Sequence, residues 1–484
     1  MKLWKVIEQV KLLKLRVDAE LEISNLACDS REVKPGGIFF ALRGTKHNGE
    51  DYIEEAIANG AVCVVLESIP KFCQCGYIQV RDARIAMALI AGNMFNNRAR
   101  NLRIVAITGT NGKTTTAYMT SSVLASAGHK VTIIGTQGSL VDGTLEYYGL
   151  TTPDPITLHE IFEKSYQRGV KYVVMELSAH AIYLKKAFGI QFDVAIFTNL
   201  SHDHLDFFGD IEMYAQVKES LFYDISAKYA VVNVDDKLGK IIYDKRIEYG
   251  YVTCSYGITN PADIFAIDIE SCDGIKCLVN VCDDVLELKT KFNGMFNVYN
   301  MLAAISAARA LSASTASIVN AFNEMSPPDG RYQVIDGICR IIIDFAHTAD
   351  ALKNLLETVK ESKTGNLICV FGCGGERDKF KRAVMGRVSA SLADYTIITS
   401  DNSRSEDPAQ IASEIEMGFL GTDSRYEIIL DRQKALSKAI SMANASDQIV
   451  VAGKGDEQYL EENGIKRPYS DKETIQTILG RLAL

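Results

Sequence analysis

The sequence has few cysteines and lacks the spacings typical of zinc sites. Its 11 cysteines are spread over 484 residues, too sparsely for a disulfide scaffold. Cys73 and Cys75 enclose one residue, and Cys369 and Cys373 enclose three, without further partners at zinc-finger spacing. We therefore expect reduced thiols in a cytosolic protein.

Long apolar segments and a positive net charge are also absent. No run of about 18 apolar residues predicts a membrane span. The amphipathic first 15 residues contain four lysines and lack the apolar core of a secretion signal. The 52 basic against 61 acidic residues give a net charge of −9, which argues against nucleic acid or a membrane surface as a partner.

The length and composition indicate a globular enzyme of about three domains. Hydrophobic residues make up 47% and charged residues 23%, and the chain has no internal repeat. Alternating strand and helix patterns predict an α/β fold. We place the domains at residues 1–98, 99–331 and 332–484, with boundaries near the polar stretch 96–101 and the helix-breaking stretch 326–331.

Short apolar runs predict mostly parallel sheets in the second and third domains. In the second domain the predicted strands are residues 102–108, 172–175, 194–197 and 229–233. Residues 262–292 favour antiparallel strands, and residues 293–311 favour an alanine-rich helix. In the third domain, of nucleotide-fold type, the predicted strands are residues 340–344, 366–371, 395–399 and 448–451.

A glycine-rich segment follows the first strand of the second domain and opens a helix, as a phosphate-binding loop does. Its backbone N–H groups, the helix N-terminus and the lysine all favour phosphate. The ordinary Walker spacing would place a glycine at Ile107, so this is a shorter loop; the alternative is a glycine turn with a chance lysine. The predicted phosphate-binding residues are Gly109, Thr110, Asn111, Gly112, Lys113, Thr114 and Thr115.

Two later strands end in polar residues that could face the same phosphates. Glu176 ends one strand, and the pair Asp203-His204 follows the next. Ligands bind at the carboxyl ends of parallel strands, so Glu176 and His204 are candidate magnesium ligands. Each residue alone could equally be an ordinary polar residue at a strand end.

Together these motifs resemble the Mur ligases, the ATP-dependent amino-acid ligases of peptidoglycan precursor synthesis. The segments GTNGKTT, MELSAHA, TNLSHDHLD and DFAH occur in the family's order, and the resemblance extends from Asp29-Ser-Arg31 to Gly453-Lys-Gly455. It implies a UDP-sugar-binding first domain, an ATP-binding second domain and a Rossmann-like third domain that binds the amino acid and swings to close the site. It also implies a bacterial, cytoplasmic enzyme, which we expect to be a monomer.

The resemblance implies a reaction in which ATP phosphorylates a carboxylate and an amine then displaces the phosphate. Lys113, His204 and Lys218 would be catalytic, with Mg²⁺ held by Thr114, Glu176, His204 and a carbamate on Lys218. Without the resemblance, Lys218 would be predicted to be an exposed helix lysine. Asn300, Arg331, Asp344 and His347 would contact ATP, although the last two could instead be a helix cap and a satisfied histidine.

The implied acceptor is a UDP-N-acetylmuramoyl dipeptide. Lys186 stands where relatives more often have arginine, so charge is kept but the bidentate fork is lost. Thr151 and Thr152 precede a proline and could alternatively be turn residues. The residues implied to contact this substrate are Ser30, Lys46, His47, Asn48, Thr151, Thr152, Ser178 and Lys186.

The segment Ser400–Pro408 discriminates between the amino acids that such enzymes add. Members that add meso-diaminopimelate have an arginine here, because the distal carboxylate of that substrate needs a cation. Arg404 matches it, but Ser403 replaces a proline and Asp456 replaces a histidine of the family pattern. The implied amino-acid-binding residues are Arg377, Asp401, Asn402, Arg404, Gly453 and Glu457.

We therefore expect a ligase that adds meso-2,6-diaminopimelate to the D-glutamate of UDP-N-acetylmuramoyl-L-alanyl-D-glutamate. The first alternative is L-lysine or another diamino acid as the added residue. A ligase of the superfamily that adds D-alanyl-D-alanine or polyglutamate is disfavoured by the segment around Arg404. A catalytically silent nucleotide-binding homologue is the remaining alternative.

Overall fold

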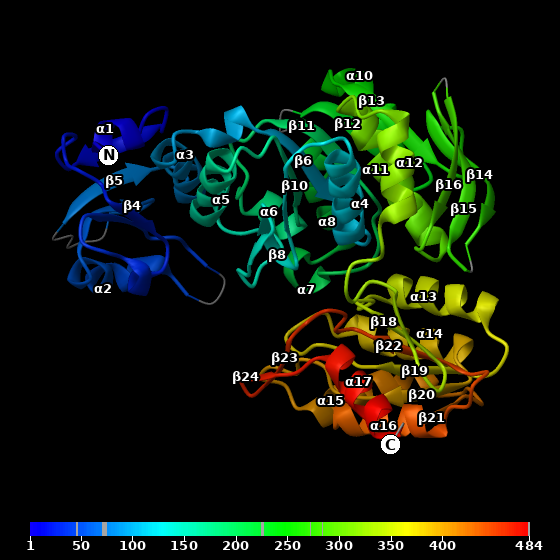
Figure 1. The fold of residues 1–484 in the computed structure, drawn as a ribbon. Helices are drawn as coiled ribbons and strands as arrows, with labels where there is room; N and C mark the ends of the chain where they lie inside the picture. The colour runs from blue at the N-terminus through cyan, green and yellow to red at the C-terminus, as the bar shows by residue number, and fades with distance from the viewer. Residues whose placement is uncertain (45–46, 70–74, 224–226, 272, 283, 483–484) are drawn as a thin grey trace.

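The computed structural model describes residues 1–44, 47–69, 75–223, 227–271, 273–282 and 284–482. Three α/β domains follow one another along the chain, each built around its own main sheet (Figure 1). This arrangement confirms the predicted α/β fold. The exact domain boundaries at residues 98 and 331 remain predictions.

The first sheet has the strand order β1-β5-β4-β3-β2, with β1 antiparallel to an otherwise parallel set. Its strands are β1 (Leu12–Arg16), β2 (Asn25–Ala27), β3 (Gly37–Phe40), β4 (Ala61–Leu66) and β5 (Gly76–Val80). Its helices are α1 (Leu3–Val6), α2 (Ile53–Ala58) and α3 (Ala83–Met94). Asp82 caps α3 by accepting from the backbone N–H groups of Arg84 and Ile85.

The central sheet has eleven strands in the order β16-β15-β14-β13-β12-β11-β6-β10-β7-β8-β9. Its strands are β6 (Arg103–Thr108), β7 (Val131–Gly135), β8 (Gly138–Val141), β9 (Thr144–Glu146), β10 (Tyr172–Glu176), β11 (Phe192–Phe197), β12 (Ala227–Asn233), β13 (Val252–Gly257), β14 (Ile264–Glu270), β15 (Ile275–Val281) and β16 (Asp284–Thr290). The strands from β7 to β14 in this order are parallel, and antiparallel strands extend both edges. The predicted antiparallel segment 262–292 is thus confirmed.

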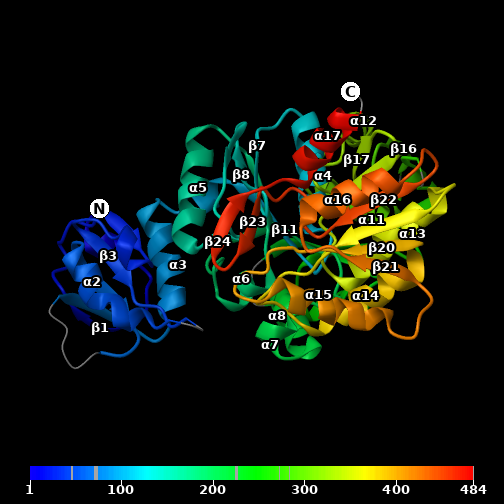
Figure 2. The ribbon, with the colours of Figure 1, turned by 90° about the horizontal axis from the view of Figure 1, so that it is seen from below.

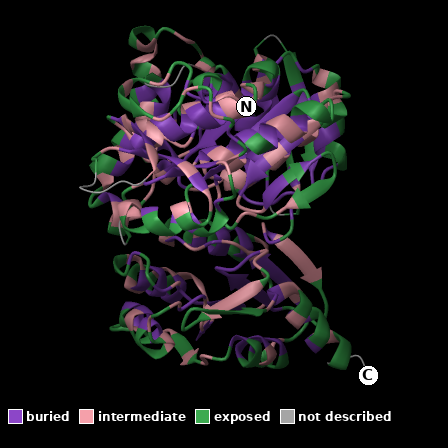
Figure 3. Ribbon diagram, turned by 90° about the vertical axis from the view of Figure 1, so that its left-hand side faces the viewer, coloured by how far each residue is buried: buried purple, intermediate pink, exposed green. Residues whose placement is uncertain are grey.

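Helices cover both faces of the central sheet, which explains why its middle strands are mostly buried. One face packs against α4 (Lys113–Ser126), α11 (Met295–Ala310) and α12 (Thr315–Glu324). The other packs against α5 (Pro155–Gln167), α6 (Ala179–Tyr183), α8 (Ile211–Tyr223) and α9 (Lys237–Asp244). The short helices α7 (Leu205–Phe208) and α10 (Arg246–Tyr249) complete this part. The buried residues concentrate inside each domain (Figure 3).

The third sheet has the order β17-β18-β22-β19-β20-β21, parallel except for β17. Its strands are β17 (Gln333–Asp336), β18 (Arg340–Asp344), β19 (Leu367–Phe371), β20 (Tyr395–Ile398), β21 (Arg425–Ile428) and β22 (Gln448–Ala452), and a separate hairpin comprises β23 (Tyr459–Glu462) and β24 (Ile465–Pro468). The helices α13 (Ala349–Ser362), α14 (Phe380–Leu392) and α15 (Pro408–Glu416) cover one face, and α16 (Arg432–Met442) and α17 (Asp471–Leu482) cover the other.

The third domain lies against the edge of the central domain where the parallel strands end (Figures 1 and 2). Gly330 packs directly against the backbone of Gly455 and Asp456. Within the described part of the chain, no helix combines the length and apolar content that crossing a bilayer requires.

Candidate active site

The phosphate loop joins β6 to α4, and two of its glycines are required by close approaches. Gly112 has φ +85°, and a Cβ there would lie 2.2 Å from the amide oxygen of Asn300. Gly109 has φ +150°, and a Cβ there would lie 1.8 Å from Thr198 Oγ1. A side chain at either position would push the loop away from its support.

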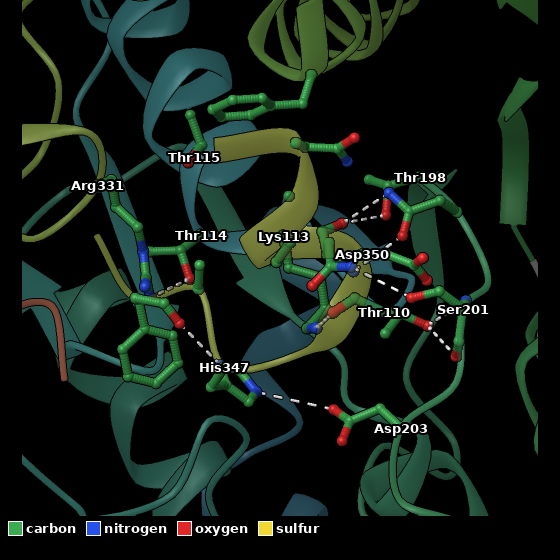
Figure 4. Close-up of a pocket in the computed structure, with 18 of the residues that line it drawn as sticks. Thr110, Lys113, Thr114, Thr115, Thr198, Ser201, Asp203, Arg331, His347 and Asp350 are labelled. Carbon is green, nitrogen blue, oxygen red and sulfur yellow. Dashed lines mark hydrogen bonds and ion pairs between the residues drawn. The ribbon is translucent and has the colours of Figure 1, made fainter. Parts of the chain in front are cut away.

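The segment after β11 forms hydrogen bonds with the phosphate loop. The backbone N–H of Thr110 donates to the carbonyl of Asn199 at 2.8 Å, and the backbone N–H of Asn111 donates to Asn199 Oδ1 at 2.9 Å. Thr198 Oγ1 donates to the carbonyl of Asn111 at 2.7 Å, and the backbone N–H of Ser201 donates to Thr110 Oγ1 at 3.0 Å (Figure 4). The loop is therefore fixed by hydrogen bonds as well as by its own glycines.

Lys113 lies inside this loop and is partly buried. Its Nζ donates to the carbonyls of Gly109 and Thr110 at 3.0 and 2.8 Å. Burial lowers the pKa of Lys113, while Glu176 and Asp203 oppose that shift. The ammonium is thus held beside the loop by carbonyls and nearby carboxylates.

Glu176, at the end of β10, joins the phosphate loop to the end of β7. Thr114 Oγ1 donates to Glu176 Oε1 at 2.9 Å, and Arg331 donates to Thr114 Oγ1 at 3.3 Å. Thr136, which the sequence analysis did not single out, donates to Glu176 through its backbone N–H at 2.9 Å and its hydroxyl at 3.2 Å. Its position directly after β7 is the signal that could have identified it.

The hydroxyl of Thr114 and the carboxylate of Glu176 are the hard oxygen donors that Mg²⁺ prefers. No cluster of three or more histidine, cysteine, aspartate or glutamate side chains that could hold a metal occurs among the described residues. Mg²⁺ commonly binds through one or two protein oxygens together with substrate phosphates. The residues present therefore fit that ion at the phosphate loop.

Lys218 is buried, so the alternative prediction of an exposed helix lysine is wrong. It is 1% exposed, and its Nζ lies 4.3 Å from the ring centroid of Tyr214. No hydrogen bond or ion pair reaches this nitrogen from the described residues. Burial and the nearby Lys113 hold the pKa of Lys218 well below its usual value. The signal was its spacing: Lys218 lies four residues from both Tyr214 and Phe222, on the apolar face of α8.

His204 follows β11 and faces the same region. Its backbone is left-handed, with φ +58°, and its Nε2 lies 3.3 Å from Asp203 Oδ2. Burial lowers the pKa of His204 to about 3, although Asp203 opposes the shift. The ring is therefore neutral at physiological pH, which is the form that can bind a metal.

Arg331 and residues at the start of the third domain line the same cavity as the phosphate loop. The guanidinium of Arg331 lies 4.1 Å from the ring centroid of Phe345. Asp344 accepts from the backbone N–H groups of Tyr332 and Ala346 at 2.7 and 2.8 Å, and burial raises its pKa. Asp344 is not the cap of α13, because Thr348 fills that position.

Asn300, on α11, packs against the phosphate loop, and both its amide oxygen and its amide nitrogen form hydrogen bonds. It accepts from Thr116 Oγ1 at 3.3 Å and donates to Asn297 Oδ1 at 3.0 Å. These contacts support the loop at Gly112. A contact between Asn300 and adenine remains a prediction.

The residues expected to hold the muramoyl peptide continue from Glu176. Thr152 Oγ1 donates to the carbonyl of Glu176 at 2.9 Å and accepts from the backbone N–H of Ser178 at 3.1 Å. Lys186 Nζ donates to the carbonyl of Thr152 at 2.8 Å, and Thr151 Oγ1 lies 3.2 Å from Thr136 Oγ1. The structure therefore brings these four predicted residues together beside the carboxylate.

The predicted contacts of the first domain lie apart from this cluster. Ser30 is buried and its hydroxyl donates to Glu55 at 2.6 Å. The Nδ1 of His47 lies 3.2 Å from the hydroxyl of Tyr52, and Asn48 accepts from the backbone N–H of Glu50. Lys46 lies outside the described residues.

The amino-acid motif forms a charged network around Lys454, which the sequence analysis did not single out. Its buried Nζ lies 2.8 Å from Glu457 Oε2, 3.1 Å from Asn402 Oδ1 and 3.8 Å from Asp401 Oδ1. Asn402 also donates to Glu457 at 2.8 Å. Lys454 and Arg432 hold the pKa of Asp401 below its usual value, against the effect of burial.

Arg404 and Gly453 lie at the two sides of this network. Arg404 has φ +53°, and its side chain donates to the carbonyl of Gly375. A Cβ at Gly453 (φ +108°) would lie 2.7 Å from Asp401 Oδ2, so only glycine fits. Arg377 is exposed, and no hydrogen bond or ion pair engages it within the described residues.

One cavity of about 730 Å³ connects the phosphate loop with this network. Predicted residues from all three functional sets line it: Thr110, Asn111, Gly112, Lys113, Thr114, Thr115, Thr151, Glu176, Ser178, His204, Asn300, Arg331, Asp344, His347, Arg377, Arg404 and Glu457. The other described residues predicted for the site do not line this cavity: Ser30, His47, Asn48, Gly109, Thr152, Lys186, Lys218, Asp401, Asn402 and Gly453.

Known protein families and relatives match this chain along most of its length. Three family models cover residues 22–106 ("Mur ligase family, catalytic domain"), 107–308 ("Mur ligase middle domain") and 330–455 ("Mur ligase, glutamate ligase domain"). A UDP-N-acetylmuramoyl-L-alanyl-D-glutamate–2,6-diaminopimelate ligase from Caldanaerobacter subterraneus is 39% identical over 96% of both chains. The chain belongs to the Mur ligase family.

Further relatives agree with that assignment. A protein of Clostridium acetobutylicum named as ligase 1 of the same type is 37% identical over the full length of both chains. A solved structure of a ligase of this type has a TM-score of 0.70 and 30% identity, covering 100% of this chain and 99% of that one. A MurF ligase of Thermotoga maritima in complex with ADP shares the fold, with a TM-score of 0.64 and 19% identity over 94% and 97% of the chains. The predicted family and enzyme class are therefore confirmed.

The two departures from the Mur ligase pattern occupy different surroundings. Ser403, in place of proline, is buried, and its carbonyl accepts from Glu406 at 3.0 Å. Hydrogen bonds between Arg404 and the hairpin residues Glu461 and Asn463 hold the same turn, so it is fixed without the proline ring. Asp456 packs against Gly330 and does not line the cavity.

Proposed function

We propose that this Mur ligase joins meso-2,6-diaminopimelate to the D-glutamate of UDP-N-acetylmuramoyl-L-alanyl-D-glutamate, using ATP, in peptidoglycan precursor synthesis. The observation that carries the proposal is the cavity in which the phosphate loop faces Arg377, Arg404 and Glu457. The names of the full-length relatives support the same activity. We further propose that the protein acts as a monomer in the bacterial cytoplasm.

The chemistry requires two anions to meet. A carboxylate oxygen of D-glutamate attacks the γ-phosphorus of ATP, ADP leaves, and an acyl phosphate forms. The amine of the amino acid then attacks the acyl carbon, the C–O bond to phosphate breaks, and phosphate leaves as the nitrogen loses a proton. Lys113 and Arg331 supply positive charge where the negative groups converge, so positioning and charge compensation provide the catalysis.

Magnesium, when bound, would neutralise charge on the phosphate oxygens and on the leaving phosphate. Thr114 and Glu176 would hold one ion, and His204 with Lys218 would serve a second. An amine reacts with CO₂ only in its neutral form, which burial favours for Lys218. The product, a carbamate, is an anionic oxygen donor, so the buried Lys218 suits that role.

The amino-acid network suits a substrate with an amino-acid head at its far end. Arg404 would bind the distal carboxylate, and Glu457 and Asp401 would accept from the distal ammonium. L-lysine lacks that carboxylate and would leave the guanidinium without its partner. The network therefore favours diaminopimelate over L-lysine.

The test is an Arg404→Met variant compared with Arg425→Met, a matched change of an exposed arginine on β21. Phosphate release is measured with ATP, Mg²⁺, the UDP-dipeptide and either diaminopimelate or L-lysine. We expect Arg404→Met to lower kcat/KM for diaminopimelate by about 10- to 100-fold, because a charge-assisted hydrogen bond is lost. Arg425→Met should be unchanged. Equal activity of Arg404→Met and wild type with diaminopimelate would refute the assignment.

A further inference from the structure

Asp203 is a buried carboxylate at which the second and third domains meet. It follows β11, and its side chain is 5% exposed. Its Oδ2 lies 3.3 Å from His204 Nε2, and 3.7 Å from His347 Nε2 (Figure 4). Its Oδ1 lies 3.5 Å from Lys381 Nζ. His204 belongs to the second domain, whereas His347 and Lys381 belong to the third.

The two partners from the third domain come from separate elements. His347 precedes α13, and its Nδ1 lies 2.9 Å from the carbonyl of Phe345. Lys381 lies in the first turn of α14, and its side chain is 10% exposed. Two separate elements of the third domain therefore converge on one carboxylate of the second domain.

These contacts exist only when the third domain lies against the second. Movement of the third domain away from the phosphate loop would remove two of the three partners. A carboxylate buried without its partners is costly, so the contacts of Asp203 with Lys381 and His347 favour the closed arrangement.

Asp203 also touches His204 directly. Histidine side chains that serve a site are commonly oriented by a carboxylate on one ring nitrogen. The same carboxylate that receives Lys381 therefore also contacts the ring of His204. Closure of the third domain and orientation of His204 are joined through one side chain.

We propose that Asp203 and Lys381 are positioning residues for the ligase reaction, and that their ion pair fixes the third domain over the phosphate loop while Asp203 orients His204. The inference rests on the proposed function, because the acyl phosphate must be attacked by an amine brought by the third domain. Neither residue need touch the substrate.

The test uses the full-length chain with Lys381→Met, Lys381→Arg, Asp203→Asn and the Asp203→Asn/Lys381→Met double variant. Lys434→Met is the matched control, since Lys434 is 79% exposed on α16. Small-angle scattering measures the change in radius of gyration when a non-hydrolysable ATP analogue, Mg²⁺ and the UDP-dipeptide are added. Phosphate release with diaminopimelate gives kcat and the KM for each substrate.

We expect Lys381→Met to lose most of the ligand-dependent compaction of the wild type and to lower kcat at least tenfold. Lys381→Arg should restore both, and the control should match the wild type. The double variant should show the same compaction and kcat as the more impaired single variant, because each single substitution already removes the same ion pair. Since Lys381→Met could also weaken folding, Lys381→Arg and the thermal unfolding midpoint of each variant accompany it.

Normal compaction and normal kcat in Lys381→Met would overturn the proposal. It would also be overturned if the fold-losses in kcat of Asp203→Asn and Lys381→Met multiplied in the double variant. Wild type that compacts with ligands but releases no phosphate with diaminopimelate would instead overturn the proposed function. The two failures are therefore distinguishable.

Discussion

His159 provides a measurable link between the structure and the pH dependence of stability. It lies on α5 against α3, where its Cε1 is 3.3 Å from the position a Cβ on Gly92 would occupy. Its ring packs edge-on against Phe162, and no described residue forms a hydrogen bond with its Nδ1. Burial therefore disfavours the charged ring and lowers its pKa from 6.5 to about 4.

The sign and size of the effect follow from these two values. The unfolded chain binds the proton near pH 6.5, and the folded chain does so only near pH 4, so acid favours unfolding. The stabilisation is complete above pH 6.5 and is lost as the pH falls through about 4. The full loss is about 3 kcal/mol, and about 2 kcal/mol of it is lost between pH 7.5 and 5.

The assay is urea unfolding of wild type and His159→Phe, followed by circular dichroism at pH 7.5 and pH 5. Phenylalanine keeps a planar ring but cannot bind a proton. The wild type should lose about 2 kcal/mol more than the variant between the two pH values. The reasoning would be refuted if both proteins lost the same free energy over this interval.

Four further variants test the site. Lys218→Met should lower the rate of phosphate release at least about a hundredfold, because it removes the lysine that would carry the oxygen donor for magnesium. The affinity for ATP, measured by calorimetry, should stay within a few-fold of wild type, because Lys218 forms no hydrogen bond with the described phosphate loop. Comparable losses of phosphate release and of ATP affinity would contradict this role. Gly109→Ala should abolish nucleotide binding by calorimetry, since its Cβ would overlap Thr198, and binding at wild-type affinity would exclude that overlap. Glu176→Gln should raise the Mg²⁺ concentration needed for half-maximal phosphate release at least about tenfold, whereas an unchanged Mg²⁺ dependence would remove it from the metal site. Lys454→Met should raise KM for diaminopimelate more than KM for ATP, because it releases Glu457 and Asn402, and equal changes in the two KM values would argue for a general structural role.

The sequence predicts those parts of the fold in which local pattern decides the outcome. β6, β10 and β11 each contain a run of four apolar residues, because helices cover both faces of the central sheet. β9 and the hairpin β23–β24 were not predicted, because their residues are mostly exposed and carry no apolar alternation. Their positions depend on pairing with a neighbouring strand.

The same distinction applies to the site. The phosphate loop is contiguous in sequence, so its glycines and Lys113 could be identified directly. The pair formed by Asp203 and Lys381 could not, because the two residues lie far apart in the chain and meet only where the third domain packs on the second. Lys454 could not either, because Asp401 and Asn402 lie about 50 residues before it and meet it only in the folded third domain. Lys218 was recognisable only through resemblance, although its helical spacing already placed it on a buried face.

The central claim is tested most directly by product formation with purified wild-type protein. ATP, Mg²⁺ and UDP-N-acetylmuramoyl-L-alanyl-D-glutamate are supplied with meso-diaminopimelate or L-lysine, and the products are identified by mass spectrometry beside phosphate release. The proposed function predicts one phosphate released per UDP-tripeptide formed, with diaminopimelate strongly preferred. Ligation of L-lysine with equal kcat/KM, or no ligation of either amino acid, would contradict it.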